Sequence, residues 1–307
     1  MGRGIIAASA LVATIGAADA PSTAFGVGVL RRDGVIIPFA AFDGKRWTSP
    51  WPPPQGDLTV PVTLSGVPSR WWGPTGMLEQ WQATTTAGTR TMRVVQPDWV
   101  NVHCALDVAL RTDYQPEKSA PPRAAQPYPK DGLAVSPPHA VEPIEIVSLA
   151  SDEIRALLPV VHMSFNQAER RTEDQHGHPV ARRGREGVQP AIEAVYAYGQ
   201  NPRVFYVEAR RPYRELGQYL GECAAFGFGT GWFVRDAAGI RELTMFVDLL
   251  DCGRQMGSYM LPLGVFRLND RLYWLAQFSG WDHERYVVVE IKKKSVDVVI
   301  NKWGGAC

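Results

Sequence analysis

Short apolar runs separated by turn residues cover most of the chain, and this pattern predicts β-strands. Residues 25–42 hold two apolar runs around Arg32-Asp33-Gly34, and an Asp-Gly turn between such runs is typical of a hairpin. From residue 191 onward about eight more runs follow at even spacing, as in an antiparallel meander. Other strand patterns lie at residues 58–64, 80–95 and 98–110. We therefore expect a mainly β fold built from antiparallel hairpins.

Two of these hairpins resemble each other. Residues 28–44 read GVLRRDGVIIPFAAFDG and residues 264–280 read GVFRLNDRLYWLAQFSG, with six identities in seventeen positions, and a fainter copy lies at residues 231–249. Repeated hairpins are typical of folds built from copies of one unit. In a β-propeller the first and last blades are neighbours, so similar hairpins at both ends of the chain fit a β-propeller-like fold. A β-sandwich, or another antiparallel arrangement, is the alternative.

The middle of the chain departs from the strand pattern. Residues 115–143 contain eight prolines, which predict an extended linker or long surface loop. Ser151 then precedes two acidic residues, the pattern of a helix N-terminus. We expect this helix to be interrupted near Pro159, to resume as far as Arg171, and to be followed by a polar loop over residues 172–190. The resulting plan is a signal peptide (1–18), a Trp-rich β region (19–114), a Pro-rich linker (115–150), a helical insertion with a polar loop (151–189) and a β meander (190–307) that forms one β domain with residues 19–114.

The first twenty residues have the three parts of a secretory signal. Arg3 gives a positive start, a short apolar segment follows, and small residues then offer cleavage after Ala18 or Ala20. Pro21 disfavours the second site, so we expect cleavage after Ala18. The apolar segment is shorter than the roughly 20 residues that span a bilayer, which argues against a membrane anchor. The pattern predicts bacterial-type export to the periplasm or beyond, with no transmembrane segment after cleavage.

Export changes the interpretation of the cysteines. In an oxidising compartment an even number of cysteines predicts disulfides, and four allow three pairings. A bridge from Cys252 to Cys307 is favoured because it would hold the chain end; buried free thiols are the alternative. The disulfide candidates are Cys104, Cys223, Cys252 and Cys307.

Charge and tryptophan content narrow the class of partner. Lys and Arg number 32 against 31 Asp and Glu, and this balance argues against a nucleic-acid binder.

Six of the ten tryptophans lie within residues 47–99. Aromatic faces bind sugar rings and proline-rich peptides, so we expect Arg70, Trp71 and Trp72 to form an exposed loop that binds a glycan, protein or peptide ligand. The alternative is that these tryptophans fill gaps between β-layers.

The segment Trp281-Asp282-His283-Glu284-Arg285-Tyr286 holds the densest group of polar residues. If it is extended, Asp282 and Glu284 share one face roughly 7 Å apart, and His283 points the other way. Carboxylates at about that separation act as acid and base in glycoside hydrolysis. Asp282, His283 and Glu284 are therefore the candidate catalytic residues. The alternative is a hairpin loop whose charges pair with their neighbours.

A second histidine pair lies in the predicted polar loop. His176 and His178 could share a metal ion if His162, Glu173 or Asp174 supplied a third ligand; a solvated loop is the alternative. The nearby basic residues 182–185 could contact an anionic partner or belong to the same solvated loop. No phosphate-binding, dinucleotide-binding or known catalytic motif occurs, and we expect no cofactor.

Two functions remain open from the sequence. The first is a non-catalytic exported binding or interaction protein with a Trp-rich surface. The second is a secreted hydrolase, possibly glycan-directed, that uses the carboxylates of residues 281–286. The absence of a catalytic motif favours the first.

Overall fold

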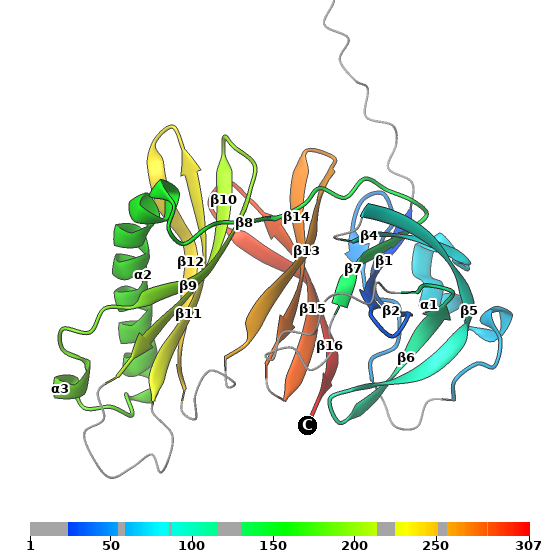
Figure 1. Ribbon diagram of the computed structural model, residues 1–307, viewed down its shortest axis with the longest axis horizontal. Coiled ribbons are helices and arrows are strands. Elements are labelled where there is room, and N and C mark those ends of the chain that lie inside the picture. Colours follow the sequence, from blue (N-terminus) through cyan, green and yellow to red (C-terminus); the bar gives the residue numbers. More distant parts are fainter. Residues whose placement is uncertain are drawn as a thin grey trace, which may run out of the picture.

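The computed structural model describes residues 24–307, apart from residues 55–58, 86–87, 116–129, 214–224, 251–256 and 281. The expected mainly β, antiparallel fold is confirmed. One long helix, two open sheets and a closed sheet are stacked in layers (Figure 1). The predicted signal peptide lies outside the described residues.

Six strands of a seven-stranded sheet close into a barrel. β1 pairs with both β7 and β2, which completes the ring β1-β7-β4-β5-β6-β2. The β2–β6 pairing joins Val35 to Arg111 across a long sequence interval, so the hairpin pattern alone could not predict this closure. The strands are β1 (Phe25–Arg31), β2 (Val35–Phe42), β3 (Trp47–Thr48), β4 (Gln80–Thr85), β5 (Gly88–Val102), β6 (Ala105–Thr112) and β7 (Lys130–Ser136).

Part of the predicted proline-rich linker is a barrel strand. β7 lies between β1 and β4, with Leu133 and Val135 buried in the core. The apolar run from residue 133 to 135 contains no proline and supplies the strand, and Pro137 and Pro138 follow its end. Residues 116–129 of the predicted linker lie outside the described residues.

The second layer is a five-stranded sheet in the order β12-β11-β10-β9-β8. Its strands β9 to β12 pair in chain order, as the meander pattern predicts, whereas α2 and α3 lie in the chain between the paired strands β8 and β9. The strands are β8 (Glu145–Ile146), β9 (Ala191–Tyr198), β10 (Arg203–Pro212), β11 (Phe226–Asp236) and β12 (Gly239–Leu250).

Helix α2 (Asp152–His176) covers one face of this sheet without a break at Pro159. The predicted N-terminus is confirmed, since Ser151 Oγ accepts a hydrogen bond from the Ile154 amide at 3.3 Å. The predicted interruption is wrong. A proline inside a helix costs about 3 kcal/mol. Complete burial of Leu157 and Phe165 against the sheet contributes roughly 1.5–3 kcal/mol per side chain and offsets that cost.

The C-terminal half of α2 also covers an edge of the sheet. Arg171 Nη2 donates to the Met245 carbonyl at 3.0 Å, and Thr172 Oγ1 donates to the Val247 carbonyl at 2.8 Å. Both carbonyls belong to β12, the outer strand. These hydrogen bonds cover the open edge of β12, which removes a site for unwanted strand pairing. The helix continues five residues past its predicted end at Arg171.

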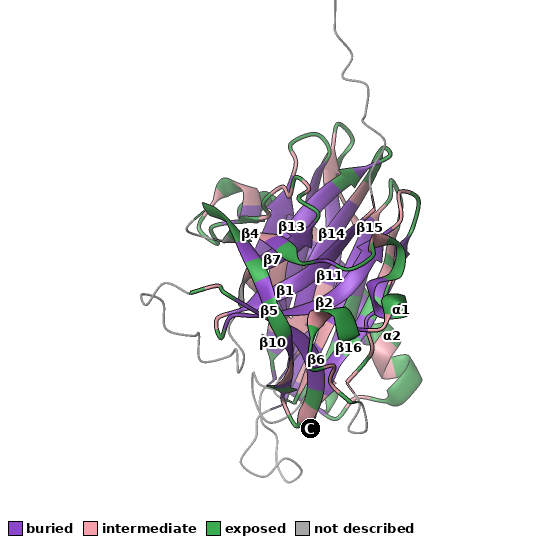
Figure 2. Cartoon of the chain, turned by 90° about the vertical axis from the view of Figure 1, so that its right-hand side faces the viewer, coloured by how far each residue is buried: buried purple, intermediate pink, exposed green. Residues whose placement is uncertain are grey.

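The third layer is a four-stranded sheet between the other two. One face packs on the five-stranded sheet through Met260 and Trp274, and the other packs on the barrel through Phe266 and Tyr286. Viewed from the barrel side, the strands of these layers are largely buried (Figure 2). The strands are β13 (Tyr259–Leu268), β14 (Arg271–Ser279), β15 (His283–Ile291) and β16 (Val296–Ala306).

The two similar hairpins are β1–β2 and β13–β14, which belong to different sheets. Each has a register shift beside a glycine, Gly28 in one and Gly264 in the other. The hairpins meet across the core between barrel and sheet, where the rings of Phe25 and Phe266 lie 5.1 Å apart. The repeat therefore does not mark neighbouring blades of a propeller, and the third copy, β11–β12, lies in the remaining sheet.

A disulfide joins the C-terminus to the barrel. Cys307 is bonded to Cys104 in the β5–β6 turn, with Cα atoms 4.7 Å apart. The favoured Cys252–Cys307 pairing is therefore wrong, because β16 ends beside the β5–β6 turn. Cys223 and Cys252 lie outside the described residues. Among the helices described, none is long and apolar enough to cross a membrane.

Candidate functional site

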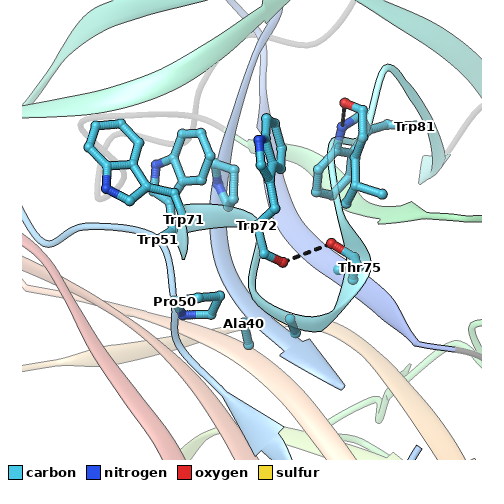
Figure 3. Close-up of a pocket in the computed structure, with 11 residues that line it drawn as sticks. Ala40, Pro50, Trp51, Trp71, Trp72, Thr75 and Trp81 are labelled. Atoms are coloured by element: carbon cyan, nitrogen blue, oxygen red, sulfur yellow. Dashed lines mark hydrogen bonds between the residues drawn. The ribbon is translucent and has the colours of Figure 1, made fainter. Parts of the chain in front are cut away.

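The predicted tryptophan surface lies inside the barrel. Trp71 and Trp72 are 7% and 4% exposed and belong to the short helix α1 (Ser69–Trp72), between two single turns, η1 (Leu64–Gly66) and η2 (Gly73–Thr75). They surround a cavity of about 20 Å³ together with Trp51 and Trp81 (Figure 3). Such a volume holds about one water molecule and excludes a sugar ring.

The expected exposure of this segment is therefore wrong, although Arg70 is exposed. The two adjacent tryptophans both reach the core because the barrel wall curves around α1. Trp51 packs against both indoles, with ring centroids 5.5 and 5.2 Å away, and its Nε1 donates to the Val108 carbonyl at 2.8 Å. The alternative interpretation, that tryptophan fills a wide interior, fits this geometry.

The two candidate metal ligands have different environments. His176 is the exposed last residue of α2, whereas the side chain of His178 is 2% exposed. Gly177, at a φ of +76°, turns the chain between them. His178 Nδ1 accepts a hydrogen bond from the Val180 amide at 3.0 Å. Within the described part of the chain, no three potential metal-ligating side chains come together.

The basic residues 182–185 form the short helix α3 (Arg182–Arg185) rather than a free loop. Arg185 makes two hydrogen bonds to Glu173, at 2.6 and 2.7 Å, and Arg182 pairs with Glu186. Two of the cluster's charges are thus compensated within the chain. This geometry favours a structural role for these two arginines.

The catalytic candidates of residues 281–286 do not form the expected pair of carboxylates. β15 begins at His283, so Asp282 lies in the bend before the strand, and Trp281 lies outside the described residues. Glu284 is fully buried and accepts a hydrogen bond from Tyr286 Oη on the barrel side of the sheet. Asp282 is exposed and contacts His283 instead.

His283 connects Asp282 to Ser258, a serine that no sequence motif marks. Its Nδ1 lies 2.7 Å from Asp282 Oδ1, and its Nε2 lies 3.3 Å from Ser258 Oγ. Because a carboxylate only accepts hydrogen bonds, Nδ1 carries the hydrogen and Nε2 of the neutral ring faces the serine hydroxyl. The hydrogen bond from His283 lowers the pKa of Asp282, which keeps this carboxylate ionised.

The ends of three strands bring these groups together. Ser258 immediately precedes β13, and His283 is the first residue of β15. β14 lies between these strands, and its Ser279 pairs with Tyr259 on one side and Glu284 on the other. The imidazole therefore crosses the end of β14 to reach Ser258.

Gly280 makes this crossing possible. A Cβ atom at Gly280 would lie 2.5 Å from His283 Cε1, well inside van der Waals contact. The glycine amide also donates to the His283 carbonyl at 2.9 Å, which fixes the start of β15. The missing side chain at this position thus leaves the space that the imidazole occupies.

The C-terminal residues support the site from the other side. The Cys307 amide donates to the Asp282 carbonyl at 2.8 Å, and the disulfide holds Cys307 on the β5–β6 turn. The indole of Trp303 on β16 is stacked on the His283 ring, with centroids 5.9 Å apart and planes 6° apart. The site therefore combines the half-buried hydroxyl of Ser258, an oriented imidazole and an aromatic surface.

A buried group of charges lies on the barrel side of the same strands. It contains Glu284, Asp107 of β6 and Lys302 of β16, whose Nζ donates to the Pro38 carbonyl at 2.9 Å. Burial raises the pKa of Asp107 to about 6 and lowers that of Lys302. None of the described side chains donates a hydrogen bond to Asp107, so the neutral acid forms at a higher pH than it does in water.

Ser258 carries almost no signal in the sequence. It lies 24 residues before Asp282, in Gly257-Ser258-Tyr259, and matches no nucleophile motif. The one signal in the sequence is that Ser258 lies at the start of a strand. In the structure this strand, β13, is separated from the strand of His283 by β14. That neighbourhood depends on strand order, which the sequence pattern did not supply.

Comparison with known proteins assigns no function to this group of residues. No protein-family model, curated protein or solved structure matches the chain.

Proposed function

We propose that this protein is a hydrolase that cleaves carboxylic esters by acyl transfer through Ser258. The observation that carries this proposal is the continuous contact Asp282–His283–Ser258. A hydroxyl bonded to an imidazole, which is in turn oriented by a carboxylate, is the arrangement that activates serine nucleophiles on unrelated folds.

Each residue has one role in the proposed reaction. Ser258 Oγ attacks the ester carbonyl carbon while its proton passes to His283 Nε2. The imidazolium, stabilised by Asp282, then gives this proton to the departing alcohol oxygen as the carbon–oxygen bond breaks. A water molecule repeats the sequence on the acyl-serine, which releases the acid and restores the hydroxyl.

The geometry favours this chemistry over both functions expected from the sequence. The binding surface was to consist of Trp71 and Trp72, which are buried. The glycosidase mechanism needed Glu284 beside Asp282, and Glu284 is buried on the barrel side. Ester cleavage uses neither feature. The leader pattern of residues 1–20 and the disulfide support an exported enzyme.

Covalent labelling tests the proposal directly. The full chain is treated with diisopropyl fluorophosphate, which transfers its phosphoryl group to an activated serine and releases fluoride. We expect one adduct in the intact mass, located at Ser258 by peptide mapping. Ser258→Ala should abolish labelling, and His283→Ala should slow it by roughly 10²- to 10⁴-fold, the usual contribution of a general base.

Ser279→Ala is the matched control. Ser279 lies on β14 next to the site, but it is 4% exposed and its Oγ has no hydrogen-bond partner among the described residues. Labelling of this variant should equal that of the wild type. An unlabelled wild type, or equal labelling of Ser258→Ala, would refute the hydrolase and favour the binding protein.

A further inference from the structure

The tryptophans of this chain differ sharply in exposure. In the part of the chain that the structure describes, Trp303 is the one exposed tryptophan, with 43% of its surface accessible. Trp51, Trp71 and Trp72 fill the barrel, and Trp274 lies in the core between the open sheets. Burial of an indole is favourable, so the contacts of this exposed indole are informative.

The exposed indole lies against the proposed catalytic base. Its plane is within 6° of the His283 ring plane, at a centroid distance of 5.9 Å. Side chains alternate along a strand, so His283 shares a face of β15 with Arg285, which is the residue opposite Trp303 in the β15–β16 register. Because the strand order is β13-β14-β15-β16, β16 and Ser258 lie on opposite sides of the imidazole. The indole therefore supports the base from the side away from the nucleophile.

The edge contacts of His283 leave the orientation of its ring weakly restrained. Its Nδ1 is bonded to Asp282, whose side chain is 50% exposed, and its Nε2 lies 3.3 Å from Ser258 Oγ. The χ2 torsion of histidine is intrinsically broad, so these contacts alone allow the ring to tilt. A stacked indole restricts that tilt, and it thereby keeps Nε2 directed at the serine hydroxyl.

The stacked indole also acts on the charge of the base. When His283 takes the serine proton it becomes an imidazolium ion, and a cation within about 6 Å of an indole centroid is attracted by the ring face. The contact at 5.9 Å meets that condition. The neutral imidazole of the ground state carries no such charge, so this attraction is stronger in the transition state and lowers the barrier.

The end of β16 holds the indole in this position. A Cβ atom at Gly305 would lie 2.5 Å from the Val102 carbonyl oxygen, so the backbone just after Trp303 is closely packed on the barrel. The disulfide then fixes Cys307 on the β5–β6 turn. Movement of the indole away from His283 is thus restricted.

We infer that Trp303 is a positioning residue for acyl transfer, which fixes the plane of the His283 ring and stabilises the imidazolium ion. This inference rests on the proposed function and adds a residue to it. Because the indole acts through His283 rather than on the ester, its loss should lower kcat and leave KM nearly unchanged.

The test measures hydrolysis of phenyl acetate by the wild type, Trp303→Ala, Trp303→Leu and Trp303→Phe. Loss of the stacked ring should lower kcat about 3- to 10-fold in the Ala and Leu variants, with KM changed less than about 2-fold. Phenylalanine restores an aromatic face, so Trp303→Phe should keep at least about half of the wild-type kcat. Leucine restores bulk without that face, and it therefore separates the ring contact from simple packing.

Val298→Ala is the matched control, because Val298 is 59% exposed on the same strand and is not part of the proposed site. Its kcat and KM should equal those of the wild type. A raised KM with unchanged kcat in Trp303→Ala would show that the indole binds the substrate, and a wild-type kcat in Trp303→Leu would show packing alone. Either result would overturn the positioning role.

Labelling by diisopropyl fluorophosphate separates failure of the two proposals. An unlabelled wild type would refute the hydrolase and, with it, the role of Trp303. We expect Trp303→Ala to be labelled about 3- to 10-fold more slowly than the wild type, in step with its kcat. Normal labelling of the wild type at Ser258, with an equal rate in Trp303→Ala, would refute the role of Trp303 alone. The difference between the Leu and Phe variants keeps the test decisive if Trp303→Ala fails to fold.

Discussion

Asp282 and Asp107 show how environment sets the state of a single residue. Asp282 is exposed at the start of β15, and its hydrogen bond with His283 lowers its pKa. Asp107 is fully buried, and loss of solvation raises its pKa to about 6 despite the nearby charge of Lys302. The first carboxylate can therefore orient a base, whereas the second takes up a proton below about pH 6.

Asp107 should make the stability of the fold depend on pH. The unfolded chain ionises this group near its ordinary value of 3.8, and the folded chain near 6. Between these values the folded state holds the proton more tightly, so the free energy of unfolding falls as the pH rises. The fall is about 2 kcal/mol from this group between pH 4 and pH 7.

Urea unfolding of the wild type and Asp107→Asn at both pH values measures this effect. Because Asn does not titrate, the wild type should lose about 2 kcal/mol relative to the variant on going from pH 4 to pH 7. A difference between the two proteins that stays constant with pH would contradict the assignment.

At the scale of elements, the disulfide connects β16 with the β5–β6 turn and so joins the four-stranded sheet to the barrel. The bridge spans 203 residues. A long closed loop restricts the unfolded chain strongly, which stabilises the fold by about 5 kcal/mol in the chain-entropy estimate. The same bridge holds the residue whose amide donates to Asp282.

Removing the bridge should lower the free energy of unfolding by up to about 5 kcal/mol. The double variant Cys104→Ser, Cys307→Ser is compared with the wild type by denaturant unfolding. Each single variant should lose as much as the double, because either change breaks the same bond. A loss below about 1 kcal/mol in all three would show that the bridge does not constrain the unfolded chain.

At the scale of the whole molecule, the four-stranded sheet is the common partner of the other layers. Its two faces contribute to separate cores, one with Phe25 and Phe39 of the barrel and one with Val204 and Tyr206 of the five-stranded sheet. Unfolding of the barrel would expose the first core, and unfolding of the five-stranded sheet would expose the second. The layers should therefore unfold together.

Unfolding followed by two probes tests this cooperativity. Tryptophan fluorescence reports mainly on the barrel interior, and far-ultraviolet circular dichroism reports on all strands. The two transitions should coincide. Val204→Ala, in the core away from the barrel, should lower both midpoints equally. A fluorescence transition that stays at its original denaturant concentration would show that the barrel unfolds separately.

The sequence by itself determined the features that depend on neighbouring residues. Apolar runs around Arg32-Asp33-Gly34 predicted the β1–β2 hairpin, and Ser151 with its two following acids predicted the start of α2. Both signals lie within a few residues, where turn and capping chemistry act. The segment 281–286 was also recognised as chemically unusual, although the partner of His283 was not.

Only the tertiary structure decided the features that depend on which distant faces become buried. Barrel closure joins Val35 to Arg111, and Cys307 reaches Cys104 because of where β16 ends. Ser258 meets His283 only because β13 and β15 flank β14, and because Gly280 leaves room for the imidazole. Strand alternation gives each strand two faces but does not say which strand each face will meet. The pairing of strands and faces is set by the burial of all apolar surfaces together. This burial placed the tryptophans inside the barrel and brought Ser258 and His283 together at the strand ends.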